Sequence, residues 1–72
     1  MSEMKEEIID TLITVMNSRE PIELRASAAK GLGYAGGAKA IKALKDILFD
    51  RHPIPLRAAV AEALGRIAEK IE

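Results

Sequence analysis

Residues 21–33 read Pro21-Ile22-Glu23-Leu24-Arg25-Ala26-Ser27-Ala28-Ala29-Lys30-Gly31-Leu32-Gly33, and residues 53–65 read Pro53-Ile54-Pro55-Leu56-Arg57-Ala58-Ala59-Val60-Ala61-Glu62-Ala63-Leu64-Gly65. The second stretch largely repeats the first, 32 residues further along the chain. A supersecondary unit repeated at such a distance is typical of a solenoid, in which each unit buries its apolar face against its neighbours. The repeat therefore predicts the architecture, but it does not name a binding target.

The 72 residues fit one small domain over 1–72, near the lower size at which a single hydrophobic core outweighs chain entropy unaided. Cysteine is absent, no run of residues is long and apolar enough for a membrane span, and the start does not resemble a signal peptide. We therefore expect a cytoplasmic protein, and its small size makes a partner subunit a reasonable source of further burial.

The charge is balanced overall but unevenly distributed. Eleven basic and 11 acidic residues give a net charge of zero, which disfavours a general binder of nucleic acid or of membrane surfaces. Residues 1–20 sum to −3, residues 21–50 to +2 and residues 51–72 to +1. A solvated mixture of surface charges explains this pattern, and complementary ends that attract a second copy are the sharper hypothesis.

Apolar residues at helical spacing predict helices over about 4–17, 21–34, 38–49 and 53–71. Proline suits the start of the second and fourth helices, and the Gly36-Gly37 pair ends the second. Shifting the numbering by 32 also maps the third helix onto the first. With the proline-started helices named A and the others B, the sequence predicts an all-α superhelix of four antiparallel helices, two units in B-A-B-A order.

The repeated residues resemble those of HEAT repeats, in particular the short HEAT-like type first associated with phycobilisome lyases. The resemblance covers about residues 8–71 and is carried by Leu-Arg, an alanine-rich helix that closes on Leu-Gly, and Asp50 before a proline-started repeat. It implies antiparallel helix pairs stacked into a curved array, with the B helices on the concave side, and binding of proteins or, in some members, of nucleic acid. It also implies structural roles between repeats for Arg25, Asp50 and Arg57. Lyase activity is not carried over, because two repeats offer little surface to wrap a tetrapyrrole.

Two surfaces are candidates for interaction. The terminal helices carry more apolar surface than one buried side requires, which predicts self-association through Ile8, Ile13, Ala61, Ala68 and Ile71. The third helix carries a basic row with an aromatic residue at its end, a candidate partner-binding face formed by Lys39, Lys42, Lys45 and Phe49. Phe49 is either tucked under the following loop or part of an interface, where aromatic residues are enriched.

Residues with the chemistry of an enzyme do not converge in the sequence. His52 is the single histidine and stands in a loop two residues after Asp50, where we expect it to be exposed to solvent. An Asp-x-His pair supplies too few ligands for zinc, and the hydroxyl residues have no histidine at helical spacing. The glycines of residues 31–37 follow a helix and lack the Lys-Ser/Thr ending of a phosphate-binding loop. The sequence thus predicts no catalytic residue, no metal site and no cofactor.

The leading hypothesis is a non-enzymatic module for protein–protein interaction or assembly, which self-associates through its terminal helices with a dimer favoured. The alternative is an adaptor that binds an acidic protein or nucleic acid through the lysine row, and a lyase-related or cofactor-binding protein is the least favoured reading. Nucleic acid and membrane are disfavoured as partners, and no small-molecule substrate is identified. Irregularities such as Phe49 and Pro55 argue against an idealised consensus design.

Overall fold

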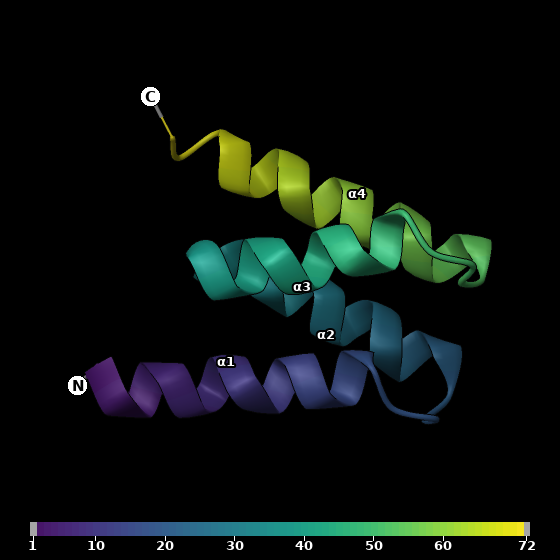
Figure 1. The fold of residues 1–72 in the computed structure, drawn as a ribbon, viewed down its shortest axis with the longest axis horizontal. Coiled ribbons are helices and arrows are strands. Elements are labelled where there is room, and N and C mark those ends of the chain that lie inside the picture. The colour runs from purple at the N-terminus through teal and green to yellow at the C-terminus, as the bar shows by residue number, and fades with distance from the viewer. Residues whose placement is uncertain (1, 72) are drawn as a thin grey trace.

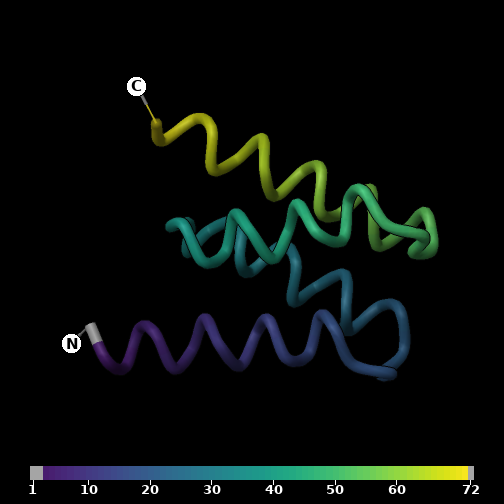
Figure 2. Tube along the Cα trace, viewed as in Figure 1, coloured from purple at the N-terminus to yellow at the C-terminus, as the bar shows by residue number. Residues whose placement is uncertain are grey.

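The computed structural model describes residues 2–71, which form four α-helices. These are α1 (Ser2–Met16), α2 (Ile22–Ala35), α3 (Ala38–Leu48) and α4 (Ile54–Ala68). Successive helices run in opposite directions, so that α1 and α3 point one way and α2 and α4 the other (Figure 1). The start of α1 and the tail after α4 consequently lie at the same end of the molecule (Figure 2). The predicted all-α fold of four antiparallel helices is confirmed.

Two prolines start the repeated helices in the same way. Pro21 and Pro53 have extended backbones, with φ/ψ of −53/149° and −56/146°, and each directly precedes its helix. The carbonyl of Pro21 accepts a hydrogen bond from the amide of Arg25, and the carbonyl of Pro53 accepts one from the amide of Arg57. Each proline is therefore the N-cap residue, one position before the helical start expected from the sequence.

The connection between α2 and α3 depends on two glycines. Gly36 and Gly37 have φ of +71° and +90°, in the left-handed region that side chains with a Cβ rarely adopt. The amide of Gly36 donates to the carbonyl of Leu32 at 2.9 Å and satisfies a group that the helix end leaves free. The Gly-Gly pair thus ends α2 and starts α3 within two residues.

The last helix is shorter than the sequence predicts. It ends at Ala68, whereas the apolar periodicity suggested a helix to residue 71. The amides of Lys70 and Ile71 donate to carbonyls three residues back, at 3.0 and 3.1 Å, which is a tighter turn than an α-helix. Ile71 therefore lies beyond the helix and is 62% exposed, instead of continuing its buried stripe.

The helices form two layers of unequal spacing. The pair α2 and α4 packs most extensively, followed by α1 with α2 and α3 with α4, whereas α1 and α3 make few contacts. Figure 1 shows α2 passing behind α3. The helices α2 and α4 therefore form the more closely packed layer, and α1 and α3 form the more widely spaced one.

Small residues allow this close contact between α2 and α4. A Cβ atom built on Gly33 would lie 2.8 Å from the Cα of Ala63, which is closer than real Cβ atoms approach. Along the same junction, the guanidinium carbon of Arg66 lies 4.6 Å from the centre of the Tyr34 ring, a cation–π contact. Gly33 therefore sets the distance between the two repeated helices.

The hydrophobic core lies between the layers and takes residues from all four helices: Ile9, Met16, Ala28, Ala29, Leu32, Ala40, Leu44, Ile47, Leu56, Ala59, Val60, Ala63 and Ile67. Leu24 of α2 lies outside this core and is 48% exposed, although its repeat equivalent Leu56 is fully buried. Among residues 2–71, α4 has a preceding unit on the side of Leu56, whereas no unit packs against α2 on the side of Leu24.

A pair of substitutions at equivalent positions tests the role of the helix contact. We expect Gly33→Ala to lower the free energy of unfolding by about 1–3 kcal/mol, because the methyl group forces α2 and α4 apart. Gly65→Ala should be neutral or stabilising by up to about 1 kcal/mol, because alanine favours a helix and no atom lies within 4 Å of the added methyl. Urea unfolding at low micromolar concentration measures both. Equal effects at the two positions would contradict this account.

Candidate interaction surfaces

An arginine side chain connects each proline-started helix to the preceding helix by a hydrogen bond. Nε of Arg25 donates to the carbonyl of Met16 at 2.8 Å, and Nε of Arg57 donates to the carbonyl of Leu48 at 3.0 Å. Both carbonyls lie at a helix C-terminus, where main-chain acceptors lack helical partners and the helix dipole favours a positive charge. The two bonds occupy equivalent positions and connect a B helix to the A helix that follows it.

His52 joins the two units at this end of the molecule. A terminal nitrogen of Arg25 lies 3.4 Å from Nδ1 of His52, and Nε2 of the same ring lies 4.0 Å from Oδ2 of Asp50. Because a guanidinium group only donates, this contact is a hydrogen bond in the tautomer that carries its proton on Nε2. The side chain is 26% exposed, so the expectation of a solvent-exposed loop residue is wrong. The sequence alone could not reveal this contact, because Arg25 and His52 are 27 residues apart.

Asp50 acts mainly within its own loop. Its Oδ1 accepts a hydrogen bond from the amide of Arg51 at 2.8 Å, and its other oxygen faces His52. In the preceding unit, Ser18 holds the equivalent place, and its hydroxyl donates to the carbonyl of Val15 at 2.6 Å. Both residues shape the turn that precedes a proline-started helix.

Carboxylates of the same chain form ion pairs with two of the three lysines in the basic row of α3. Lys39 Nζ lies 3.0 Å from a carboxylate oxygen of Glu6 and 3.0 Å from one of Asp10, so this lysine links α3 to α1. The hydrogen bond to Asp10, followed by that to Glu6, raises the pKa of Lys39 above its ordinary value of 10.5. Because the pKa of Lys39 is higher in the folded state, its charge contributes fully to the stability of the fold at a pH below 10.5. This contribution is lost as the pH rises through the folded-state pKa.

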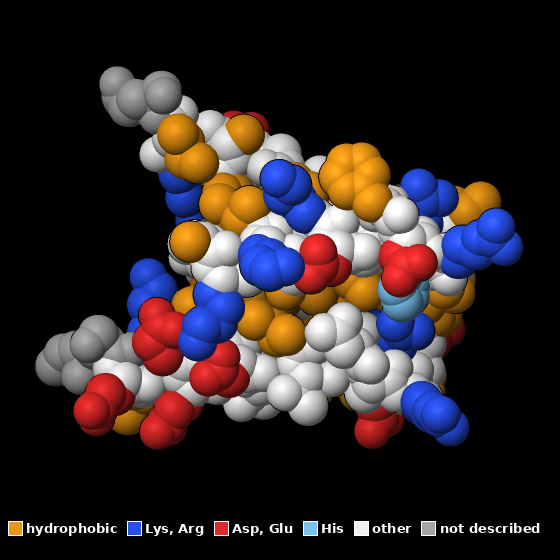
Figure 3. All heavy atoms as spheres, in the orientation of Figure 1, with side chains coloured by type: hydrophobic (Ala, Val, Ile, Leu, Met, Phe, Trp, Pro, Cys, Tyr) orange, Lys and Arg blue, Asp and Glu red, His pale blue; other side chains and the backbone are white. Residues whose placement is uncertain are grey.

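The remaining members of this face are more exposed. Lys42 forms an ion pair with Asp46 at 3.3 Å within the same helix, and Lys45 is exposed. Phe49 is the C-cap residue of α3 and is 79% exposed, so it is not tucked under the following loop. Figure 3 shows basic side chains along α3 facing acidic side chains along α1.

Ile13 does not lie with Ile8. It is half-buried and lines an open groove of about 580 Å³ between α1 and α3, together with Asp10 and Lys39. Ile8 is two residues before Asp10, so it points about 200° away, to the side of α1 that faces away from α3. The structure thus separates two residues that the sequence placed on one candidate surface.

Apolar residues gather on the free side of the first unit. Ile8 is 54% exposed on α1, and Met4 lies on the same side one turn earlier. On α2, Gly31 is two residues before Gly33 and therefore points away from α4; it is half-buried, and a Cβ atom built on it would lie 3.4 Å from the side chain of Leu12 on α1. We name this side of the first unit the N-terminal surface, formed by Met4, Ile8, Leu24, Ser27 and Gly31.

A second apolar side lies on α4, away from α2. Gly65 is two residues after Ala63, which contacts α2, and a Cβ atom on Gly65 would meet nothing within 4 Å. Ile54 is 75% exposed, and both Ala61 and Ala68 are exposed. We name this side the C-terminal surface, formed by Ile54, Ala58, Ala61, Gly65 and Ala68. Ile71 follows in the exposed tail.

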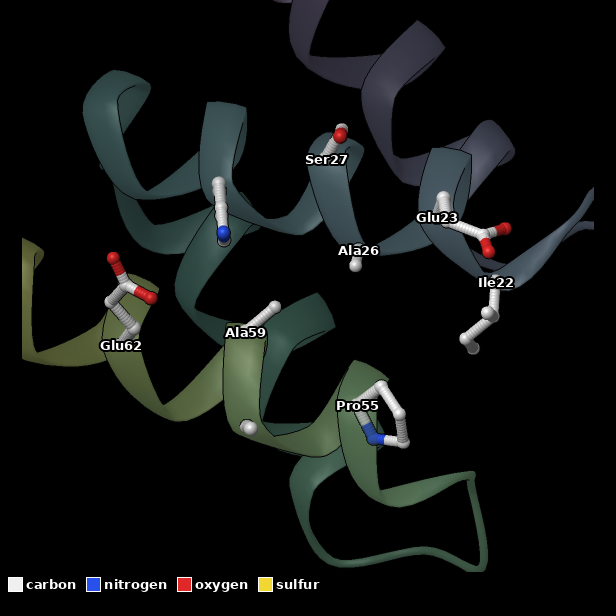
Figure 4. Close-up of a pocket in the computed structure, with 9 residues that line it drawn as sticks. Ile22, Glu23, Ala26, Ser27, Pro55, Ala59 and Glu62 are labelled. Atoms are coloured by element: carbon white, nitrogen blue, oxygen red, sulfur yellow. The ribbon is translucent and has the colours of Figure 1, made fainter.

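A groove of about 500 Å³ lies between α2 and α4 (Figure 4). Ile22 and Ala26 of α2 line it opposite Pro55 and Ala59 of α4. Its charged residues are Glu23, Lys30 and Glu62, which do not form a converging set of catalytic groups. The groove shows how the two repeated helices face each other.

Residues 2–71 contain no cluster of three or more histidine, cysteine or acidic residues able to hold a metal ion. Within the same residues, none of the helices combines the length and the apolar character needed to span a bilayer.

Residues 9–71 match the family model described as HEAT repeats. The chain belongs to the HEAT-repeat family. HEAT repeats generally mediate protein–protein interactions, and HEAT-repeat proteins are typically non-enzymatic scaffolds. The curated proteins gave no match to this chain, and neither did the solved structures.

The two arginines of this HEAT-repeat protein should differ in their effect on stability. We expect Arg25→Ala to lower the free energy of unfolding by about 1–2 kcal/mol, because it removes a charged hydrogen bond that is partly buried. Arg57→Ala should cost less than about 1 kcal/mol, because the equivalent bond is exposed. Thermal unfolding of both variants measures the difference, with Arg51→Ala in the exposed loop as the control. A larger loss for Arg57→Ala would contradict this assignment.

Proposed function

We propose that this HEAT-repeat protein is a non-enzymatic assembly module that associates with itself through the N-terminal and C-terminal surfaces. The observation that carries the proposal is the exposure of large apolar side chains on both free sides, above all Ile8 and Ile54. Repeat arrays normally end in units with a polar outer face, because an apolar end face exposed to water is unfavourable. Burial of both surfaces against a further copy removes this cost.

The charges favour another copy of the chain over an unrelated partner. Residues 1–20 sum to −3, and residues 51–72 sum to +1. Glu3 and Glu7 lie on α1 in the first unit, whereas Arg57 lies on α4 in the second. Opposite charges on the two free sides steer one copy toward the other and disfavour like-to-like contacts.

The lysine row is a weaker basis for binding. Lys39 already contacts two carboxylates and Lys42 contacts one, so only Lys45 of the three is without an acidic neighbour among these ion pairs. An acidic protein or nucleic acid would have to displace the intramolecular contacts before it could bind. Self-association also buries the apolar residues of both surfaces, so it does not depend on the lysines alone.

Sedimentation equilibrium from low to high micromolar concentration tests the proposal. We expect the average mass to rise with concentration above that of the 7.8 kDa chain. Ile8→Glu and Ala61→Glu should each reduce the association by at least about tenfold, because a charge is buried without a partner at the interface. Thr14→Glu adds the same charge at an exposed position of α1 that belongs to neither surface and should have little effect.

A monomer across the whole concentration range would overturn the proposed function. Equal weakening by all three glutamate substitutions would also count against it, because the effect would then come from net charge alone.

A further inference from the structure

The contact between the two units of the chain has a counterpart at each free side. On α2, the side that packs against α4 includes Ile22, Ala26, Ala29 and Gly33. The residues 32 positions later are Ile54, Ala58, Ala61 and Gly65, which are all exposed and form most of the C-terminal surface. The free side of α4 therefore corresponds to the side of α2 that packs against the next proline-started helix.

The N-terminal surface repeats the other half of that contact. Leu56, Ala59 and Ala63 of α4 are buried, as is Ala40 of α3. Their equivalents 32 positions earlier are Leu24, Ser27, Gly31 and Ile8, which lie on the N-terminal surface. Leucine is retained at the first of these positions, small residues stand at Ser27 and Gly31, and the larger Ile8 replaces an alanine.

We propose that a second copy stacks on the C-terminal surface with its own N-terminal surface, so that α4 of one copy packs against α2 of the next as α2 packs against α4 within the chain. This inference rests on the proposed self-association and specifies its register. The two surfaces lie on opposite sides of the molecule, so stacking in this register is head-to-tail and leaves both ends open. Successive copies then form an open array that can continue to grow, whereas the sequence analysis favoured a dimer.

One ion pair of the internal junction translates into a pair of opposite charge. Asp10 and Lys39 lie 3.0 Å apart across the units. Their equivalents at the next junction are Lys42 of one copy and Glu7 of the following copy. The two signs are exchanged, and an attraction is retained. This match of charges favours the register set by the repeat.

The second polar contact behaves in the same way. Arg25 approaches His52 at 3.4 Å within the chain. The corresponding residues between copies are Arg57 and Glu20, again a basic residue facing an acidic one. The Lys39–Glu6 ion pair does not carry over, because its equivalents between copies are Glu7 and Ala38.

The closest backbone approach is also accommodated. Within the chain, Gly33 faces Ala63 at a distance that leaves no room for a Cβ atom. Between copies, the equivalent residues are Gly65, which is exposed, and Gly31, which is partly covered by Leu12 of α1; neither has a side chain. The glycine at position 65, which costs helix stability and contacts nothing in the single chain, acquires a packing role in the array.

Two end-blocked variants test the head-to-tail arrangement. Gly65→Glu blocks the C-terminal surface, and Ser27→Glu blocks the N-terminal surface; both positions are exposed, so each variant should fold with the circular dichroism of the original chain. Each alone should lose association by at least about tenfold, whereas an equimolar mixture should form a dimer and grow no further. The mixed dimer forms because one unmodified surface of each kind remains. Thr14→Glu is the matched control and should leave the array intact.

A charge exchange tests the register independently. Lys42→Glu and Glu7→Lys should each weaken association by about three- to tenfold, as expected for the reversal of one exposed ion pair. The double variant should recover most of the loss, because the pair is restored with its signs exchanged. Recovery by the double variant and the mixed dimer together support the register.

The failure of this inference is distinct from the failure of the proposed function. Association of either end-blocked variant alone, or a double charge variant no better than the singles, would overturn the head-to-tail register while self-association stands. A wild-type chain that remains monomeric would overturn both.

Discussion

The close approach of α2 and α4 at Gly33 is the contact on which the arrangement of the other helices depends. Ala63 lies against the backbone of Gly33 with no space for a methyl group, so the two proline-started helices form the tighter layer. The helices α1 and α3 that precede them are more widely spaced and make few contacts with each other.

The loops that carry arginine and proline complete this arrangement. Each proline fixes the start of a helix, and four residues later an arginine side chain returns to the C-terminus of the preceding helix. The arginine satisfies a carbonyl and places a positive charge at the negative end of a helix dipole. At the first of these junctions His52 adds a contact from the second unit, so the ends of both units are held together.

The interaction surfaces are a consequence of repetition. Every face that one unit uses to hold the next is present again where no further unit is described, with its apolar residues exposed. Leu24 shows this most directly, because it has the same chemistry as Leu56 and differs only in what packs beside it. A solenoid built from similar units thus presents at its ends the same two surfaces that stabilise its interior.

The sequence by itself was sufficient to predict the helical class, the number of helices and their approximate limits, because these depend on local periodicity and on glycine and proline at defined positions. It also indicated the family through the repeated Leu-Arg and Leu-Gly pairs. The end of α4 could not be predicted, since the apolar spacing continues to Ile71 after the neighbours that would bury it have ended. Only the tertiary structure decided that Ile13 lies in a groove away from Ile8, that His52 meets Arg25, and that α2 and α4 form the more closely packed layer. Each of these three features depends on contacts between residues that are distant in the chain. Such contacts are determined by the packing of whole helices, whereas the periodicity of the sequence indicates only which face of a single helix is apolar.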